Sequence, residues 1–104
     1  MDGLFKALAD PSRRRILDLV RDRPGINVND LTAEFAFSRF ATMKHLRLLE
    51  EAGLVVARKE WKEKRLYLNG VPIQMIYDRW LKTFDGTWSA SLTKLKQLVE
   101  EEES

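Results

Sequence analysis

Apolar residues recur at steps of three and four through the first half of the chain, a spacing typical of helices with one buried face. The pattern predicts helices over residues 4–9 and from residue 11 to about residue 22. Asp10 is a suitable N-cap for the second of these helices, and the proline after it suits the first helical position. Pro24-Gly25 then breaks the periodicity, so we expect this helix to end before it.

The next segment is short and changes its pattern quickly. Residues 26–28 are expected to form a short strand or an extended link. Either Asn27 or Asn29 then caps a helix that continues to about Phe35. Phe37 is expected to pack under the turn that follows.

A second helix is predicted to begin after Ser38 and to stop at Gly53, so residues 31–54 have the outline of a helix-turn-helix. Positions 42, 45, 46 and 49 fall on its core side. The opposite side suits a DNA groove, where apolar atoms can touch a thymine methyl. Its members are Arg39, Phe40, Met43, Lys44 and Arg47. The alternative is that Phe40 folds back onto Phe37 or the hairpin, which leaves these cations as solvated surface charges.

Residues 54–59 and 64–68 have the composition of two strands and predict a β-hairpin. Its tip has no glycine, so we expect a longer loop and not a tight two-residue turn. Its cations suit a wing that contacts phosphates or the minor groove, and Glu60 and Glu63 weaken that case. These cations are Arg58, Lys59, Lys62, Lys64 and Arg65. Trp61 is interpreted equally well as a wedge, a contact to a partner subunit or an exposed ring.

The last third of the chain carries a long apolar stripe at steps of three and four. It predicts one helix of roughly 27 residues and about 40 Å, longer than a small domain can cover, with Gly86 as the point of a kink or break. A second copy of the chain is the expected partner, and a small-molecule pocket is the minor alternative. The expected dimer interface consists of Leu4, Phe5, Leu8, Ile76, Tyr77, Trp80, Phe84, Trp88, Leu92 and Leu95.

Composition narrows the possible functions. The net charge of the 104 residues is +2, and residues 1–68 hold 14 Lys and Arg against 10 Asp and Glu. A basic half that contains the helix-turn-helix favours a polyanionic partner. No apolar run approaches the roughly 20 residues of a membrane span, and no secretory signal is evident, so we expect no membrane partner and a cytoplasmic protein.

Candidate chemistry for catalysis is lacking. The chain has no cysteine, which excludes disulfides and thiolate metal sites. His45 is the single histidine and is expected to be a structural residue of the core side. We find no paired carboxylates, glycine-rich phosphate loop or metal-ligand spacing, so we expect no enzyme activity, no metal and no cofactor.

Three segments together resemble a known family: residues 7–17, Ser38 to Leu49, and residues 51–55. The chain is similar to ArsR-family winged helix-turn-helix transcriptional repressors over about residues 4–70. The resemblance implies a mainly α fold with a small β-hairpin wing and an added C-terminal dimerisation helix. It implies a single domain over residues 1–104, with the winged helix at 1–70 and that helix at 71–104.

The same resemblance implies the function. Ser38, Arg39, Thr42, Lys44 and Arg47 match the recognition helix, and residues 58–65 match the wing. A homodimer would then bind double-stranded DNA at a palindromic operator and repress transcription. Ligand sets of the metal-sensing members are missing, so we expect a member that does not sense metals.

The sequence leaves several alternatives open. Ala36, Phe40 and Trp61 depart from residues common in the family. The chain could instead be a protein-interaction module without specific DNA binding, or an architectural DNA-binding protein that ignores sequence. The inducer is unknown: release from DNA would depend on a small apolar ligand, a partner protein or the expression level alone.

Overall fold

The computed structural model describes the backbone of residues 2–84 and 88–103, and side chains in this range except those of residues 84, 88–92, 102 and 103. It divides into two compact units, Met1–Pro72 and Ile73–Ser104. We describe each unit by itself.

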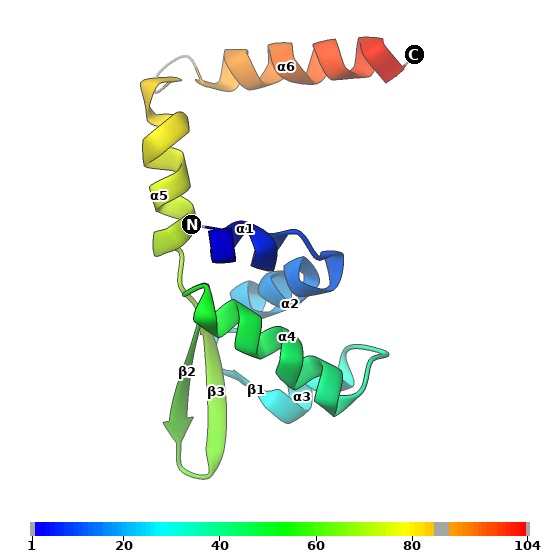
Figure 1. Cartoon of the computed structure of the whole chain (residues 1–104), viewed down its shortest axis with the longest axis vertical. Coiled ribbons are helices and arrows are strands. Elements are labelled where there is room, and N and C mark those ends of the chain that lie inside the picture. The colour runs from blue at the N-terminus through cyan, green and yellow to red at the C-terminus, as the bar shows by residue number, and fades with distance from the viewer. Residues whose placement is uncertain (1, 85–87, 104) are drawn as a thin grey trace. The chain divides into compact units, whose positions relative to one another are not determined.

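The first unit contains the expected helices and hairpin (Figure 1). Asn27, not Asn29, caps the helix before the turn, because its side chain accepts from the backbone N–H of Asp30 at 2.7 Å. Residues 26 and 27 form a short strand. The elements in chain order are α1 (Asp2–Leu8), α2 (Pro11–Asp22), β1 (Ile26–Asn27), α3 (Val28–Ala33), α4 (Arg39–Glu51), β2 (Val55–Glu60) and β3 (Glu63–Leu68).

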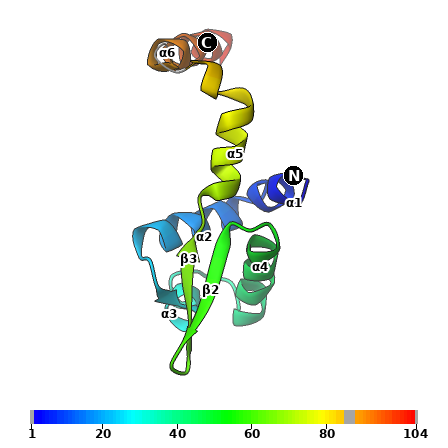
Figure 2. The same cartoon turned by 90° about the vertical axis from the view of Figure 1, so that its left-hand side faces the viewer.

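The strands form one antiparallel sheet in the order β1-β3-β2, and Figure 2 shows it beside α4 and below α2. Helix α2 packs against β3, α4 packs against β2, and α1 packs against both α2 and α4. One apolar core joins these elements, as expected when amphipathic helices cover one face of a sheet. Its largest fully buried side chains are those of Ile16, Val20, Leu31, Thr42, Leu46, Leu49, Leu54 and Leu66.

Local interactions fix both ends of α4. The Ser38 hydroxyl accepts from the backbone N–H of Ala41 at 3.1 Å, as predicted for an N-cap. At the other end Gly53 has a φ of 75°, and the backbone N–H groups of Gly53 and Leu54 donate to the carbonyls of Glu50 and Leu49. This is a Schellman motif, which needs the left-handed conformation that glycine adopts without strain.

The expectation of a long hairpin loop is wrong. Glu60 pairs with Glu63, so only Trp61 and Lys62 form the loop. Of these two residues only Trp61 has a positive φ, of 59°, which is the requirement of a type II′ turn. That position normally holds glycine, and a non-glycine residue there costs about 1 kcal/mol. The turn therefore forms despite its sequence, because the ladder on either side continues to the last pair.

The second unit contains two helices, so the apolar stripe does not form one unbroken helix of 27 residues, in line with the break that the sequence left open. Helix α5 (Val71–Trp80) begins in the first unit and is followed by a 3₁₀ turn, η1 (Lys82–Phe84), before α6 (Trp88–Glu103). Gly86, the expected point of a break, lies outside the described residues. Thr83, a poor helix former, lies in the 3₁₀ turn that follows the end of α5. Within the described parts of the chain, no helix is both long and apolar enough to cross a membrane.

Asp10 should stabilise the first unit through the start of α2. Its carboxylate accepts from the backbone N–H of Ser12 at 2.7 Å and of Arg13 at 3.3 Å. Replacing Asp10 by Ala should lower the free energy of unfolding by about 1 kcal/mol in urea titrations at neutral pH. Asp10→Asn keeps the hydrogen-bond acceptor without the charge, so it should lower the free energy of unfolding by less than Asp10→Ala.

The contribution of the Asp10 carboxylate should depend on pH. Burial acts to raise its pKa, but the backbone N–H groups of Arg13 and Ser12 and the charge of Arg13 outweigh this and hold the pKa below its ordinary value of 3.8. Stability from a carboxylate with a lowered pKa is fully present above the ordinary value and is lost as the pH falls through the lowered one. The difference between the wild type and Asp10→Ala should therefore shrink below pH 3.8, and a constant difference across that range would contradict this account.

Candidate nucleic-acid interface

The inner side of α4 holds the helix against the core. Leu46 and Leu49 are fully buried, as predicted. Thr42 is also 0% exposed, and its hydroxyl donates to the Ser38 carbonyl at 3.0 Å. The expectation from family resemblance that Thr42 contacts DNA is therefore wrong, because its side chain belongs to the core.

His45 has a structural environment. It is half-buried, its ring lies edge-on to Phe37 at 5.3 Å between centroids, and its Nδ1 lies 3.5 Å from Nη1 of Arg13. Phe37 in turn stacks on Phe35 at 4.8 Å, so it packs beside the turn before α4 as expected. Among the described residues, no group of three or more His, Asp or Glu is placed to hold a metal ion.

The outer side of α4 is exposed and cationic. Phe40 is 80% exposed, so the alternative in which it folds back onto Phe37 or the hairpin is wrong. Lys44 and Arg47 are exposed and have no carboxylate partner among the residues that the structure describes. Met43 is half-buried beside them. The helix thus presents one apolar ring and two available cations on the side away from its core.

Arg39 begins α4 and is held by α3. Its guanidinium donates to the side-chain carbonyl of Asn29. The two residues also line a hollow of about 200 Å³ that the tip of the hairpin closes on its other side. The hollow is lined by Asn27, Val28, Asn29, Arg39, Met43, Lys62, Glu63 and Lys64. The recognition helix and the wing are therefore neighbours, and Asn29 is a residue of this surface that sequence reasoning missed.

The cations of the hairpin divide between its two faces, because side chains alternate along a strand. Lys59 lies opposite Lys64 in the strand register, on the face that carries the buried Leu66 further along β3. Lys64 forms an ion pair with Glu50 of α4 at 3.1 Å between Nζ and Oε1. Arg58 lies opposite Arg65 on the other face.

Arg65 has a structural role within the unit, and its expected contact with DNA stays a prediction. Its guanidinium donates to the Gly25 carbonyl at 2.9 Å and pairs with Glu63 at 2.9 Å and Glu60 at 3.4 Å. These contacts fasten β1 to the hairpin and partly offset the charge of the two carboxylates next to the turn.

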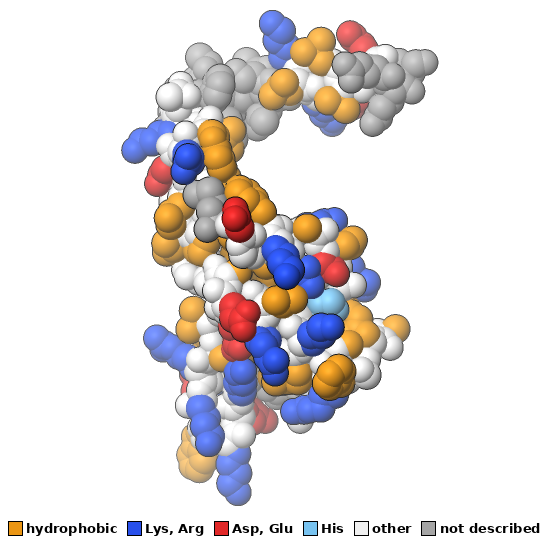
Figure 3. Space-filling view, viewed as in Figure 1, with side chains coloured by type: hydrophobic (Ala, Val, Ile, Leu, Met, Phe, Trp, Pro, Cys, Tyr) orange, Lys and Arg blue, Asp and Glu red, His pale blue; other side chains and the backbone are white. Residues whose placement is uncertain are grey.

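Exposed cations remain on α4 and on the hairpin when these ion pairs are set aside. Figure 3 shows Lys and Arg side chains along the hairpin and over α4. In the described part of the chain, six of the expected DNA-binding cations are exposed and have no carboxylate partner. They are Arg39, Lys44, Arg47, Arg58, Lys59 and Lys62. We call this set, with Phe40, the basic face.

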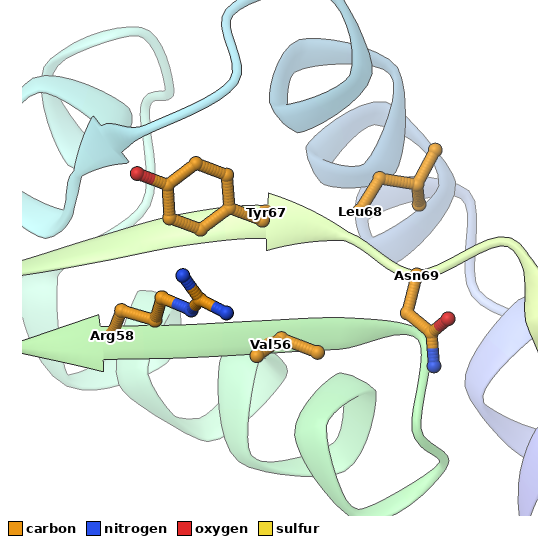
Figure 4. Close-up of a pocket in the computed structure, with 5 residues that line it drawn as sticks. All are labelled: Val56, Arg58, Tyr67, Leu68 and Asn69. Carbon is orange, nitrogen blue, oxygen red and sulfur yellow. The ribbon is translucent and has the colours of Figure 1, made fainter.

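The outer face of the hairpin carries a shallow hollow of about 380 Å³ (Figure 4). Val56, Arg58, Tyr67, Leu68 and Asn69 line it. Figure 4 shows the Arg58 guanidinium beside the Tyr67 ring, and the Tyr67 hydroxyl donates to Glu60 at 3.1 Å. The hollow is small and open, so it resembles ordinary surface relief more than the enclosed, apolar sites that hold small ligands.

The residues expected at a dimer interface differ in their exposure. Leu4 is 7% exposed and lies in the core of the first unit, so its expected place in the interface is wrong. Phe5 is exposed, and Leu8, Ile76 and Tyr77 are half-buried. The side chains of Phe84, Trp88 and Leu92 lie outside the described residues.

The second unit exposes several large apolar side chains, some of which were expected at the interface. Trp80 and Leu95, both expected interface residues, are exposed in the single chain. On α6, Leu98 and Val99 extend the Leu95 face at steps of three and four, which places them on one side of the helix. The exposed apolar side chains of this unit include Ile73, Met75, Trp80, Leu95, Leu98 and Val99.

Comparisons with known proteins agree with this geometry. A family profile described as "Helix-turn-helix domain" matches residues 8–58. The chain is 34% identical over 87 residues to the uncharacterized HTH-type transcriptional regulator YuzN of Bacillus subtilis, covering 78% of this chain and 95% of YuzN. It is 34% identical over 55 residues to the transcriptional repressor SdpR of the same organism, covering 53% of this chain and 60% of SdpR.

A solved structure extends the likeness over nearly the whole chain. An ArsR-like transcriptional regulator from Rhodococcus sp. RHA1 matches with a TM-score of 0.68 at 30% identity, covering 93% of this chain and 90% of that one. The fold and its exposed helix define a transcriptional regulator with a winged helix-turn-helix DNA-binding domain. The chain belongs to the ArsR family of these regulators.

Proposed function

We propose that this regulator is a sequence-specific repressor that binds a palindromic operator as a homodimer. The observation that carries the proposal is the division of α4 into two sides. Its inner side is buried against the core, whereas its outer side presents Phe40, Lys44 and Arg47 without carboxylate partners in the described chain. A helix with this division can lie in the major groove while the rest of the unit stays clear of the duplex.

The roles of individual residues follow from their positions on the basic face. Arg39 and Phe40 lie in the first turn of α4, the part of a recognition helix that contacts base edges. Lys44 and Arg47 lie further along the same exposed side and suit phosphate contacts, which position the helix without reading sequence. Ser38 keeps its cap and can donate its hydroxyl hydrogen to a phosphate at the same time.

Apolar residues of the second unit support assembly of two copies. Trp80, Leu95 and Leu98 are exposed in the single chain, and exposed apolar patches of this kind mark protein interfaces. Two-fold symmetry buries the same patch on both subunits and presents two α4 helices to DNA. Half-sites would then be spaced by about 10 bp, one turn of the duplex.

Repression follows if the dimer occupies DNA that RNA polymerase needs. The likeness to SdpR, which is described as a transcriptional repressor, supports repression over activation. Binding-site selection from random DNA with the purified protein tests the proposal. A two-fold symmetric consensus would support it. Equal recovery of all sequences would indicate architectural binding, and no recovery would favour a protein-interaction module.

Replacing Lys44 or Arg47 by Ala should weaken binding to the selected site by about tenfold and reduce the salt slope by about one. Each residue is an exposed cation with no internal partner in the described chain, so the loss should come from DNA and not from folding. Fluorescence anisotropy over a series of salt concentrations measures both quantities.

Arg21→Ala is the matched control for the basic face. Arg21 is also exposed, but it pairs with Asp22 at 2.9 Å and Asp18 at 3.6 Å on α2. Its loss removes the same charge away from α4 and should leave DNA affinity within about twofold. If Lys44→Ala and Arg47→Ala behave like Arg21→Ala, α4 is not the recognition helix.

Phe40 should read thymine methyl groups. Its ring is exposed in the first turn of α4, and apolar side chains in the major groove contact this methyl. Replacing thymine by uracil at individual positions of the selected site should weaken wild-type binding at one position per half-site by about 1 kcal/mol. Phe40→Ala should bind the thymine and uracil duplexes equally, whereas retained discrimination in this variant would assign the contact elsewhere.

Leu98→Glu should shift the protein from dimer to monomer in sedimentation equilibrium at micromolar concentration. The variant places a charge on the exposed apolar side of α6, where a buried interface would have to desolvate it. Gln97→Glu is the control, because it adds the same charge one position away, about 100° around the helix. Trp80→Ala should weaken the dimer by about 2 kcal/mol, as is usual for a central aromatic. A monomeric wild type would refute the homodimer.

A further inference from the structure

Trp61 occupies a turn position that suits glycine. Its φ of 59° lies in the left-handed region, where a bulky side chain is an outlier. The side chain is 97% exposed, so packing within the chain does little to offset this conformation. A strained residue with an exposed ring indicates contact with something outside the chain.

The surroundings of Trp61 are cationic. Glu60 and Glu63 flank the turn, but Arg65 pairs with both of them at 3.4 and 2.9 Å. Lys59 and Lys62 are exposed and have no carboxylate partner in the described chain. The net effect is an aromatic ring presented between two available positive charges, which suits a polyanion.

A protein partner would require more apolar surface than the tip provides. Besides Trp61, Val56 is the exposed large hydrophobic residue that the structure describes on the hairpin. It lies five residues before Trp61, on the order of 16 Å along the strand. Charged residues at positions 58–60 separate the two. A single ring between cations instead fits an apolar wedge, which enters a base step while its neighbours contact phosphates.

The position of the tip allows this contact while α4 is bound. Lys62 and Arg39 line the same hollow, so the turn lies beside the first turn of α4. Ala57, opposite the buried Leu66, lies four residues before Trp61, which places the tip on the order of 13 Å beyond the core. This reach crosses one phosphate backbone to the next groove. The minor groove, about 6 Å wide, excludes a helix but admits a side chain.

We propose that Trp61 is a minor-groove wedge that partly unstacks a base step beside the segment that α4 reads. Lys59 and Lys62 contact the phosphates on either side of it. The inference rests on the proposed DNA-binding function and adds a second element of specificity. A wedge favours steps that unstack easily, so the wing would select TA or CA steps at the edges of the operator through their deformability.

The affinity and bend of the selected duplex test the wedge. Trp61→Gly relieves the positive φ and should preserve or raise Tm, yet lose on the order of tenfold in affinity and most of the bend measured by energy transfer between the duplex ends. Trp61→Phe should retain the bend and stay within about threefold of wild-type affinity. Val56→Ala, which removes the other exposed hydrophobic residue of the hairpin, should match the wild type.

A base substitution separates the wing from α4. Replacing adenine by 2,6-diaminopurine at the flanking step adds an amino group to the minor groove and leaves the major-groove edge unchanged. Wild-type affinity should fall to the level of Trp61→Gly, and Trp61→Gly should not distinguish the two duplexes. Equal behaviour of both proteins on both duplexes would overturn the wedge.

Failure of the wedge can be told from failure of the proposed function. If Lys44→Ala and Arg47→Ala weaken binding while Trp61→Gly keeps the wild-type affinity and bend, the wedge is wrong and the function of α4 stands. If Trp61→Gly dissociates the dimer in sedimentation, Trp61 is a subunit contact and the wedge is wrong. If the wild type selects no sequence at all, the proposed function itself is wrong.

Discussion

The rotation of α4 about its own axis is the constraint on which the DNA-binding surface depends. Thr42, Leu46 and Leu49 are buried on one side of the helix, and a rotation by one residue, about 100°, would expose them to water. Burying these side chains stabilises the unit by a few kcal/mol, since each large aliphatic residue contributes about 2 kcal/mol. In the observed orientation of the helix, Phe40, Lys44 and Arg47 face outward. The core therefore sets the direction in which the recognition residues point.

The wing depends on a different balance of interactions. Its ladder runs to the last pair, Glu60 and Glu63. Two carboxylates therefore lie at the end of the hairpin that the proposed function brings close to DNA. Arg65 pairs with both and also with the Gly25 carbonyl. One guanidinium thus removes a repulsion and fastens the hairpin to β1. Guanidinium has five donors in a planar arrangement, which lets one side chain reach all three acceptors.

The two units contribute to regulation in different ways. The first unit has a complete core and carries the basic face. The second has exposed apolar side chains on α5 and α6. A duplex read by two copies of α4 requires a fixed spacing, and a symmetric contact through the second unit would supply it. Affinity for an operator would then depend on the concentration of dimer, as expected for a repressor that assembles from small subunits.

Sequence alone determined the helices of the first unit, their caps at Asp10 and Ser38, the stop at Gly53 and the side of α4 that faces the core. These features are local: a cap needs one side chain, and a helix face repeats every three or four residues. The resemblance in residues 7–17 and 38–55 likewise sufficed for the family.

Only the tertiary structure decided which cations form ion pairs or hydrogen bonds within the chain and which remain available to a partner. Arg65 was expected at DNA, but its guanidinium also bonds to the Gly25 carbonyl, 40 residues away in the chain, a contact that spacing does not report. The tight turn at Trp61 was missed because ladder pairing overrode the preference of the turn for glycine. The end of α5 at Trp80 was not foreseen, because a continuous apolar stripe hides where a helix ends. Periodicity reports which residues share a face, whereas pairing between distant segments depends on the fold that brings them together.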